Sequence, residues 1–164
     1  MIVFHGSFQV IQYPNIDFGR FKLDFGKGFY VTTFAEQAEK WALRQALIKR
    51  AKPIVNTYEF DAERLDILYF EGYNEQWLDF VVKNRAGIIE EHKYDAICGN
   101  IANDDVAAVV NDYMRLQKMG RMSPSGKQFF LEQLQYSKPN NQFCISTNKG
   151  IDALKFTRSY SLEG

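Results

Sequence analysis

The sequence is poor in cysteine and has no long apolar run. Its two cysteines, Cys98 and Cys144, each lie in a short strand-like segment without the spacing of metal ligands. Two cysteines are too few for a disulfide framework, so we expect buried free thiols in a reducing cytoplasm, and no metal site. No segment approaches the length that crosses a bilayer, so we expect no transmembrane helix and no membrane partner.

The chain also lacks an excess of charge of either sign. It carries 20 basic and 20 acidic side chains. A general binder of nucleic acid or of anionic membranes normally has a basic excess, so the balance argues against both classes. Residues 1–5 contain no basic stretch followed by a long apolar core, so we expect no signal peptide.

The composition is that of a folded protein with a substantial core. Aromatic residues make up 15% of the chain, hydrophobic residues 46% and charged residues 24%. These proportions exclude a disordered chain. Since 164 residues suffice for one domain with a real core, we expect residues 1–164 to form a single domain.

The pattern of apolar residues predicts strands and helices interspersed without a regular βαβ repeat, which is typical of an α+β domain. The expected strands and short apolar runs cover residues 2–4, 29–31, 54–60, 65–70, 94–99, 142–146 and 155–161. The expected helices cover residues 33–51, 74–86, 103–119, 127–135 and 147–154. A loop is expected over residues 8–23 and a linker over residues 123–126.

The most informative stretch is residues 24–33, Asp-Phe-Gly-Lys-Gly-Phe-Tyr-Val-Thr-Thr. Two glycines flank Lys27, so the backbone can bend sharply or pass close to a ligand. Tyr30 then lies on a predicted strand. Thr33 with Glu36 three residues later is the signature of a capping box, which predicts a helix start at Thr33. This order suits one wall of a slot, and the plain alternative is an ordinary loop before a core strand.

Three positions at strand ends, His5, Tyr30 and Gln142, carry a resemblance to the ADP-ribosyltransferase superfamily, on its diphtheria-toxin and poly(ADP-ribose) polymerase branch. His-Gly-Ser at residues 5–7 looks like that branch's His-Gly-Ser/Thr at the end of its first core strand. Residues 25–30 are very similar to the polymerases' Phe-Gly-Lys-Gly-Ile-Tyr. The whole chain looks more like a little-characterised bacterial group of the superfamily, with glutamine in the third motif, whose members are suspected toxin components or phage-defence factors.

The resemblance implies a fold and an activity. The fold is expected to be α+β, with a split antiparallel β-sheet core and flanking helices. The reaction cleaves the nicotinamide–ribose bond of NAD, without a metal, and transfers one ADP-ribose to an acceptor that is a protein, a nucleic acid or a small molecule. The expected setting is the bacterial cytoplasm, as a toxin or phage-defence effector, for which a small antitoxin is the natural partner.

The resemblance also gives each matching residue a role. Tyr30 and Trp41, eleven residues apart, are expected to form the two faces of the nicotinamide slot, because a π face attracts the positive pyridinium. His5 is expected to hydrogen-bond a ribose hydroxyl on the adenosine side, and the backbone of Gly6 to read the carboxamide. Ser7 is expected to orient His5 or the strand end. The plain alternatives are a core position for Trp41 and a satisfied histidine at a strand end.

Lys27 and Gly28 complete the expected binding set. Lys27 would pair with the pyrophosphate or hydrogen-bond within the turn, and a solvated loop lysine is the plain alternative. Gly28 would let the backbone approach the ligand closely. Together with His5 and Tyr30, Gln142 is the expected catalytic residue.

Gln142 is also where the chain departs from the family, which has a glutamate there. A glutamine keeps the acceptor for a ribose 2′-hydroxyl and loses the negative charge. Three outcomes stay open: slow single transfer, binding of NAD without turnover, or another acid that replaces the missing charge. The candidate acids are Glu132, Asp24, Asp104 and Asp105. The alternative to an enzyme is therefore a non-catalytic module that binds NAD or ADP-ribose, or an interaction module.

Overall fold

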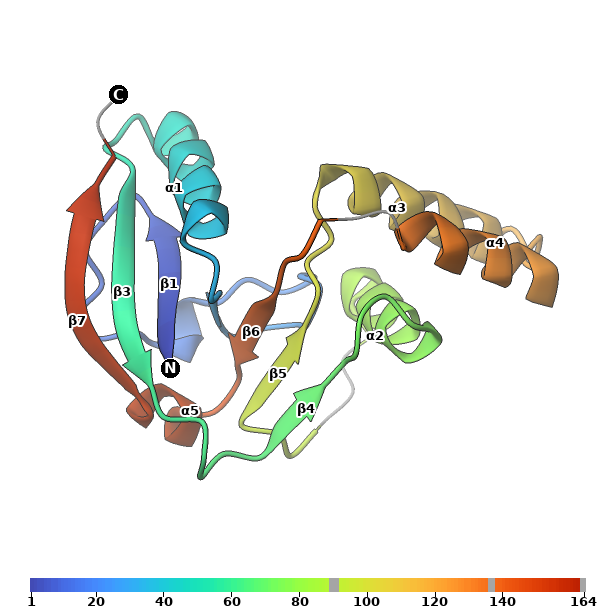
Figure 1. The fold of residues 1–164 in the computed structure, drawn as a ribbon. Helices are drawn as coiled ribbons and strands as arrows, with labels where there is room; N and C mark the ends of the chain where they lie inside the picture. The colour runs from blue at the N-terminus through green and yellow to red at the C-terminus, as the bar shows by residue number, and fades with distance from the viewer. Residues whose placement is uncertain (89–91, 136–137, 163–164) are drawn as a thin grey trace.

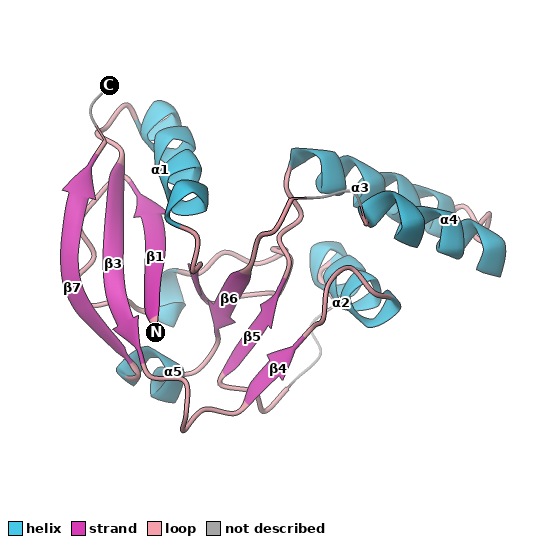
Figure 2. Cartoon of the chain, in the orientation of Figure 1, coloured by secondary structure: helices cyan, strands magenta, loops and turns pink. Residues whose placement is uncertain are grey.

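The computed structural model describes residues 1–88, 92–135 and 138–162, and its fold is mixed α+β, as the sequence predicts. The strands form two sheets, drawn in Figure 1 and Figure 2. In spatial order, the first sheet consists of β1 (Ile2–Ser7), β3 (Ile54–Phe60) and β7 (Leu154–Ser161). The second consists of β2 (Phe29–Val31), β6 (Gln142–Ile145), β5 (Ala96–Gly99) and β4 (Ile67–Tyr69).

The helices are divided between the two sheets (Figure 1). They are α1 (Ala35–Lys49), α2 (Glu75–Ala86), α3 (Asp104–Lys118), α4 (Pro124–Leu134), α5 (Asn148–Asp152) and a short 3-10 helix, η1 (Ile16–Phe18). Helix α1 packs on β1 and β3, whereas α2, α3 and α4 lie beside the second sheet. Along the described chain, none of these helices has the length and apolar character that crossing a membrane requires.

One backbone bridge joins the two sheets. Phe4 of β1 and Thr32, just after β2, exchange both of their backbone hydrogen bonds, at N···O distances of 2.8 and 3.0 Å. Beyond this bridge the chain after β2 turns away, because the Thr33 N–H donates to Asn141 Oδ1 instead. The strands that carry His5 and Tyr30 are therefore side by side for only a short distance.

Two apolar clusters bury both faces of β6. Phe143 and Ile145 belong to the cluster that also contains Tyr58 of the first sheet. Cys144 belongs to the other cluster, with Trp77 of α2. This confirms the alternation expected for residues 142–146, in which successive side chains point to opposite faces.

Both cysteines are free thiols, as expected, but only Cys144 is buried, and Cys98 is half-buried. Burial raises the pKa of Cys144 to about 12 and the pKa of Cys98 to about 11. Neither side chain is a thiolate at neutral pH, so neither is poised as a nucleophile.

The second sheet is not wholly antiparallel, which corrects the expected antiparallel core. β4 and β5 pair in parallel, with Ile67 opposite Ala96. A parallel pair needs a long crossover connection, usually a helix, and α2 provides it here. The sequence of residues 65–99, a short strand, a helix and a second strand, contains this βαβ unit, although no regular repeat of it follows.

Several predicted boundaries are shifted by a few residues, and two of these shifts matter here. The first strand extends through Ser7, so the His-Gly-Ser segment lies within β1 and not after it. The expected linker at residues 123–126 is the first turn of α4, where Ser123 Oγ accepts from the Gly126 N–H at 3.1 Å. Pro124 occupies the first turn of the helix, where its missing N–H costs nothing.

The predicted capping box is also wrong. Helix α1 begins at Ala35, and Phe34 precedes it without a side-chain cap. The Thr33 hydroxyl is used elsewhere, because it accepts from Asn141 Nδ2 at 2.7 Å. Asn141 thus holds the segment between β2 and α1, a role that the local sequence around Thr33 does not reveal.

Gly28 passes so close to β6 that no side chain fits there. A Cβ atom built on Gly28 would lie 2.5 Å from the Cys144 sulfur and 2.5 Å from the Ile145 carbonyl oxygen. The close approach expected from the Gly-Lys-Gly turn is therefore, at Gly28, an approach to the neighbouring strand.

We predict that Gly28→Ala destabilises the fold. Since the Ile145 carbonyl is backbone and cannot move aside, the overpacking should cost about 3 kcal/mol and lower Tm by about 6–12 °C in a thermal melt. Gly126→Ala is the control, because its Cβ would meet only the flexible Met122 and Ser123 side chains, at 3.3 Å. Equal melting temperatures for the two variants would contradict this packing.

Candidate functional site

His5 lies between the two sheets and connects their edges. Its ring stacks on Phe29 of β2 with centroids 4.4 Å apart, and Nδ1 lies 2.7 Å from the Tyr30 carbonyl oxygen. A carbonyl can only accept, so Nδ1 carries the hydrogen and donates it. Burial lowers the pKa of His5 below its ordinary value of 6.5, so the ring is neutral at pH 7 and its Nε2 is an acceptor.

Gly6 presents free backbone groups where the two sheets separate. The backbone N–H and C=O of Phe4 bond Thr32, so these two groups of Phe4 point away from β3. Backbone groups alternate between the edges of a strand, so those of Gly6 point the same way as those of Phe4. Thr33 has already turned to Asn141, and within the described ranges neither group of Gly6 has a hydrogen-bond partner.

Helix α1 covers the other side of Gly6. A Cβ atom at this position would lie 2.0 Å from the Ala38 carbonyl oxygen and 2.7 Å from the Ala42 nitrogen. The absence of a side chain is therefore required for α1 to pack on β1. The same glycine serves the packing of the helix and leaves a donor and an acceptor at the sheet edge.

Tyr30 closes the turn that precedes its own strand. Its hydroxyl donates to the Gly26 carbonyl at 2.7 Å and accepts from the Phe25 N–H at 3.1 Å. Burial raises the pKa of the Tyr30 phenol well above its ordinary value, so the hydroxyl stays protonated. Gly26 has a φ of +82°, a left-handed conformation that favours glycine. The tyrosine and this glycine thus fix the Gly-Lys-Gly turn together.

Trp41 lies apart from Tyr30. It is on α1 with 40% of its surface exposed, and its ring is 5.6 Å from the Arg44 guanidinium. No ring contact joins Trp41 and Tyr30 in the part of the chain that the structure describes. The two expected walls therefore come from different elements, Trp41 from α1 and Tyr30 from β2 of the second sheet.

The remaining expected binding residues have local partners. Lys27 lies with its amine 5.4 Å from the centre of the Phe21 ring. The Ser7 hydroxyl accepts from the Gln9 N–H at 3.4 Å, at the end of β1.

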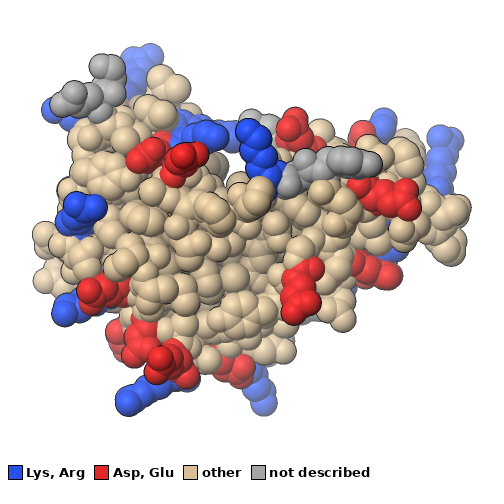
Figure 3. All heavy atoms as spheres, in the orientation of Figure 1, with Lys and Arg blue, Asp and Glu red and all other residues tan. Residues whose placement is uncertain are grey.

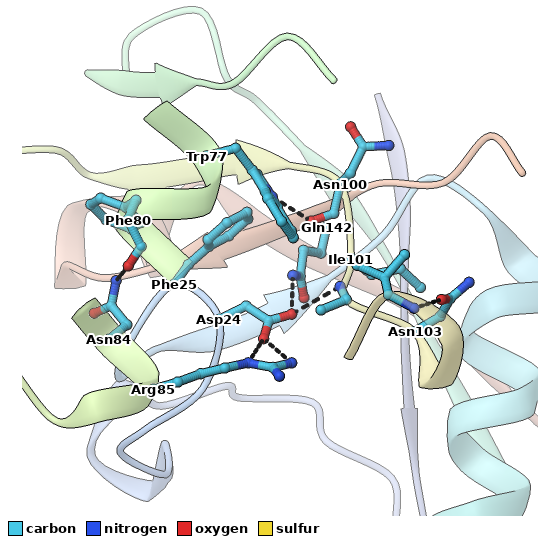
Figure 4. Close-up of polar contacts among 12 residues, drawn as sticks. Asp24, Phe25, Trp77, Phe80, Asn84, Arg85, Asn100, Ile101, Asn103 and Gln142 are labelled. Carbon is cyan, nitrogen blue, oxygen red and sulfur yellow. Dashed lines mark hydrogen bonds and ion pairs between the residues drawn. The ribbon is translucent and has the colours of Figure 1, made fainter. Parts of the chain in front are cut away.

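Gln142 belongs to a polar network with Asp24 and Arg85, shown in Figure 4. Its Nε2 donates to Asp24 Oδ2 at 3.1 Å. The same oxygen accepts from the Ala102 N–H at 3.1 Å, and Asp24 Oδ1 accepts from Arg85 Nε at 2.8 Å and pairs with its terminal nitrogen at 2.7 Å. Gln142 is buried, and the ion pair is largely buried.

Of the candidate acids whose side chains the structure describes, Asp24 alone is found beside Gln142. Glu132 is exposed on α4 and bonds Gln128 at 3.0 Å, and Asp105 is exposed on α3. The side chain of Asp104 lies outside the described part of the chain. Asp24 is not a free charge, however, because Arg85 neutralises it.

Sequence reasoning missed two residues of this site. Asn141 holds both Thr32 and Thr33, and its backbone carbonyl accepts from Gln37 Nε2 at 2.7 Å. Its position beside the third motif was the available signal. Arg85 in the last turn of α2 resembles any helix-end arginine in sequence, and no local signal distinguishes it.

The face of the molecule shown in Figure 3 carries mixed charge. Acidic and basic side chains are interspersed on the face shown in Figure 3, and Lys and Arg border a notch in its upper outline, between α1 and the start of α3. A separate groove of about 800 Å³ lies between α2, α3 and α4, and none of the expected site residues lines it. Among the described residues, no His, Cys, Asp and Glu side chains are grouped so as to hold a metal.

The chain belongs to a family described as "protein of unknown function (DUF3990)", whose model matches residues 1–156. No curated protein and no solved structure matches it. The family match covers both ends of the candidate site, from His5 to Gln142, so these residues lie within the region that defines the family.

We predict that His5 makes the stability of the fold depend on pH. Its pKa is lower in the folded protein than the 6.5 of an ordinary histidine, so protonation favours unfolding. The stability that the neutral His5 ring contributes is fully present above pH 6.5, and it is lost as the pH falls from 6.5 through the pKa of His5 in the folded protein. Thermal melts between pH 7.5 and 5 should therefore show a steeper fall for wild type than for His5→Asn.

The second histidine provides the control for this measurement. His92 lies at the surface, and the partial burial of its ring lowers its pKa as well. His92→Asn therefore removes the pH dependence that His92 contributes and leaves that of His5. Wild type and His5→Asn with the same slope would show that His5 titrates normally.

Proposed function

We propose that this protein is an NAD-dependent mono-ADP-ribosyltransferase. The observation that carries the proposal is the free backbone edge at Gly6, beside the point where β1 and β2 separate. One N–H and one C=O on the same edge are complementary to the carbonyl and amine of a carboxamide, the polar group of nicotinamide. A buried peptide edge without a protein partner is costly, so a ligand there is favoured.

His5 supports the adenosine side of this proposal. Its neutral ring uses Nδ1 for the Tyr30 carbonyl, which leaves Nε2 as an acceptor for a ribose hydroxyl. The bond from Nδ1 fixes both the tautomer and the orientation of the ring. The histidine is therefore organised for binding before any ligand arrives.

Gln142 is the proposed contact to the ribose on the nicotinamide side. Its Nε2 faces Asp24, so Oε1 is the atom that remains to accept from the 2′-hydroxyl. In the reaction, the bond between the ribose C1′ and the nicotinamide nitrogen breaks, and its electron pair leaves with nicotinamide. The acceptor's nucleophile then bonds to C1′ and gives up a proton to solvent. Positive charge develops on the ribose, and an amide stabilises it less than a carboxylate does.

The neutral amide makes a slow, single transfer the expected outcome, and it favours one second candidate function. A module that binds NAD or ADP-ribose without turnover would keep the same contacts. Under the enzyme proposal, the acceptor is a protein, a nucleic acid or a small molecule in the cytoplasm, and a small antitoxin is the proposed partner.

The direct test is nicotinamide release from NAD by the purified protein. We expect release by wild type, and a kcat/KM about tenfold lower for His5→Asn, because the amide nitrogen keeps the bond to the Tyr30 carbonyl while the acceptor at Nε2 is lost. His92→Asn is the matched control and should behave as wild type. Binding of NAD in calorimetry without release would select the binding module, and neither release nor binding would contradict both proposals.

A second prediction concerns the exposed aromatic ring on α1. If Trp41 covers one face of the nicotinamide, Trp41→Ala should weaken NAD binding about tenfold in calorimetry, because a cation–π contact is lost. Leu47→Ala is the control, since Leu47 is 81% exposed on the same helix. Unchanged affinity in a folded Trp41→Ala protein would remove Trp41 from the site.

A further inference from the structure

In the polar network beside β6, the residue types decide which groups donate hydrogen bonds and which accept them. Asp24 is a carboxylate and can only accept, so the Gln142 amide must present its nitrogen to it, at 3.1 Å. The amide oxygen is thereby turned away from Asp24. Within the described residues, Oε1 has no hydrogen-bond partner, and it is not enclosed either.

Besides Gln142, two further parts of the chain hold the Asp24 carboxylate. Arg85 of α2 binds Oδ1 through two nitrogens, and the Ala102 N–H before α3 binds Oδ2. The next residue, Phe25, is buried in the apolar cluster beneath α2. Figure 4 shows these groups converging on the Asp24 carboxylate from different elements. Both oxygens are fully used, so the carboxylate has little freedom to rotate.

We propose that Asp24 is the positioning residue of this site, and that it fixes Gln142 with Oε1 as the acceptor for the ribose. This inference rests on the proposed function for the identity of the ligand. It also explains why glutamine occupies position 142. A glutamate there would set a second carboxylate against Asp24 at hydrogen-bond distance, and like charges so close cannot both remain ionised without a large cost.

The next prediction concerns glutamate at position 142, the residue that the resembled family has there. Gln142→Glu should not improve catalysis in this chain, although the resemblance gives the family a glutamate at that position. It should instead lower Tm by about 5 °C, because it introduces an uncompensated charge in a largely buried place. Improvement should require Asp24→Asn in the same molecule, which exchanges the acid and the amide and keeps the total charge.

The test is a double-mutant cycle of wild type, Asp24→Asn, Gln142→Glu and the double exchange. Thermal melts without ligand measure the coupling of the two side chains, and nicotinamide release measures their effect on the reaction. We expect Asp24→Asn to lower kcat about 10- to 100-fold with a smaller change in KM, because the acceptor is displaced and not removed. The double exchange should regain at least half of the lost Tm and exceed both single variants in kcat.

The matched control is Asp112→Asn. Asp112 also pairs with an arginine, Arg115, at 3.1 Å, but that pair is exposed on α3. The Asp112→Asn variant should leave Tm and kcat unchanged. A loss confined to Tm in Asp24→Asn, with kcat and KM as in wild type, would show a purely structural role and overturn the inference.

The two readouts separate the inference from the proposed function. If wild type neither binds NAD nor releases nicotinamide, the proposed function fails, and additive changes in Tm would then overturn the coupling as well. If wild type is active and the changes are additive in both Tm and kcat, only the inference fails. If Asp24→Asn alone does not fold, the comparison of the double exchange with Gln142→Glu decides, since a higher Tm and kcat in the exchange are required.

Discussion

The backbone bridge between Phe4 and Thr32 is the constraint on which the candidate site depends. It holds the first sheet against the second over one residue pair and no further. A longer pairing would consume the backbone groups of Gly6, and a complete separation would take His5 away from the Tyr30 carbonyl. The site exists because the two sheets meet and then immediately part.

Several side chains maintain this geometry from outside the bridge. Asn141 binds the chain after Thr32 and directs it toward α1, and the packing of α1 depends on the missing side chain of Gly6. The Tyr30 hydroxyl fixes the turn before β2. Residues from both ends of the sequence therefore support one another, and a change in one of them alters the position of the others.

The ionisable groups of the candidate site are either paired or neutral, which the motif residues taken singly do not reveal. Asp24 accepts a hydrogen bond from Gln142, yet its pairing with Arg85 makes it a rigid acceptor and not a free charge. His5 is neutral because burial lowers its pKa. The proposed binding groups are thus largely uncharged, which suits recognition of hydroxyl and carboxamide groups and supplies little electrostatic stabilisation for a developing cation.

The sequence alone determined the mixed α+β class, the body of each α-helix and strand, and the alternation that buries both faces of β6, because these follow from local periodicity and capping residues. It also marked His5, Tyr30 and Gln142 as unusual positions at or near strand ends. It did not reveal the short 3-10 helix at Ile16–Phe18, which lies in the expected loop. Only the tertiary structure decided that β4 and β5 are parallel, that the Thr33 hydroxyl serves Asn141 and not a helix cap, and that Arg85 and Asp24 converge on Gln142. Those outcomes depend on contacts between segments 29 to 118 residues apart, which no local pattern encodes.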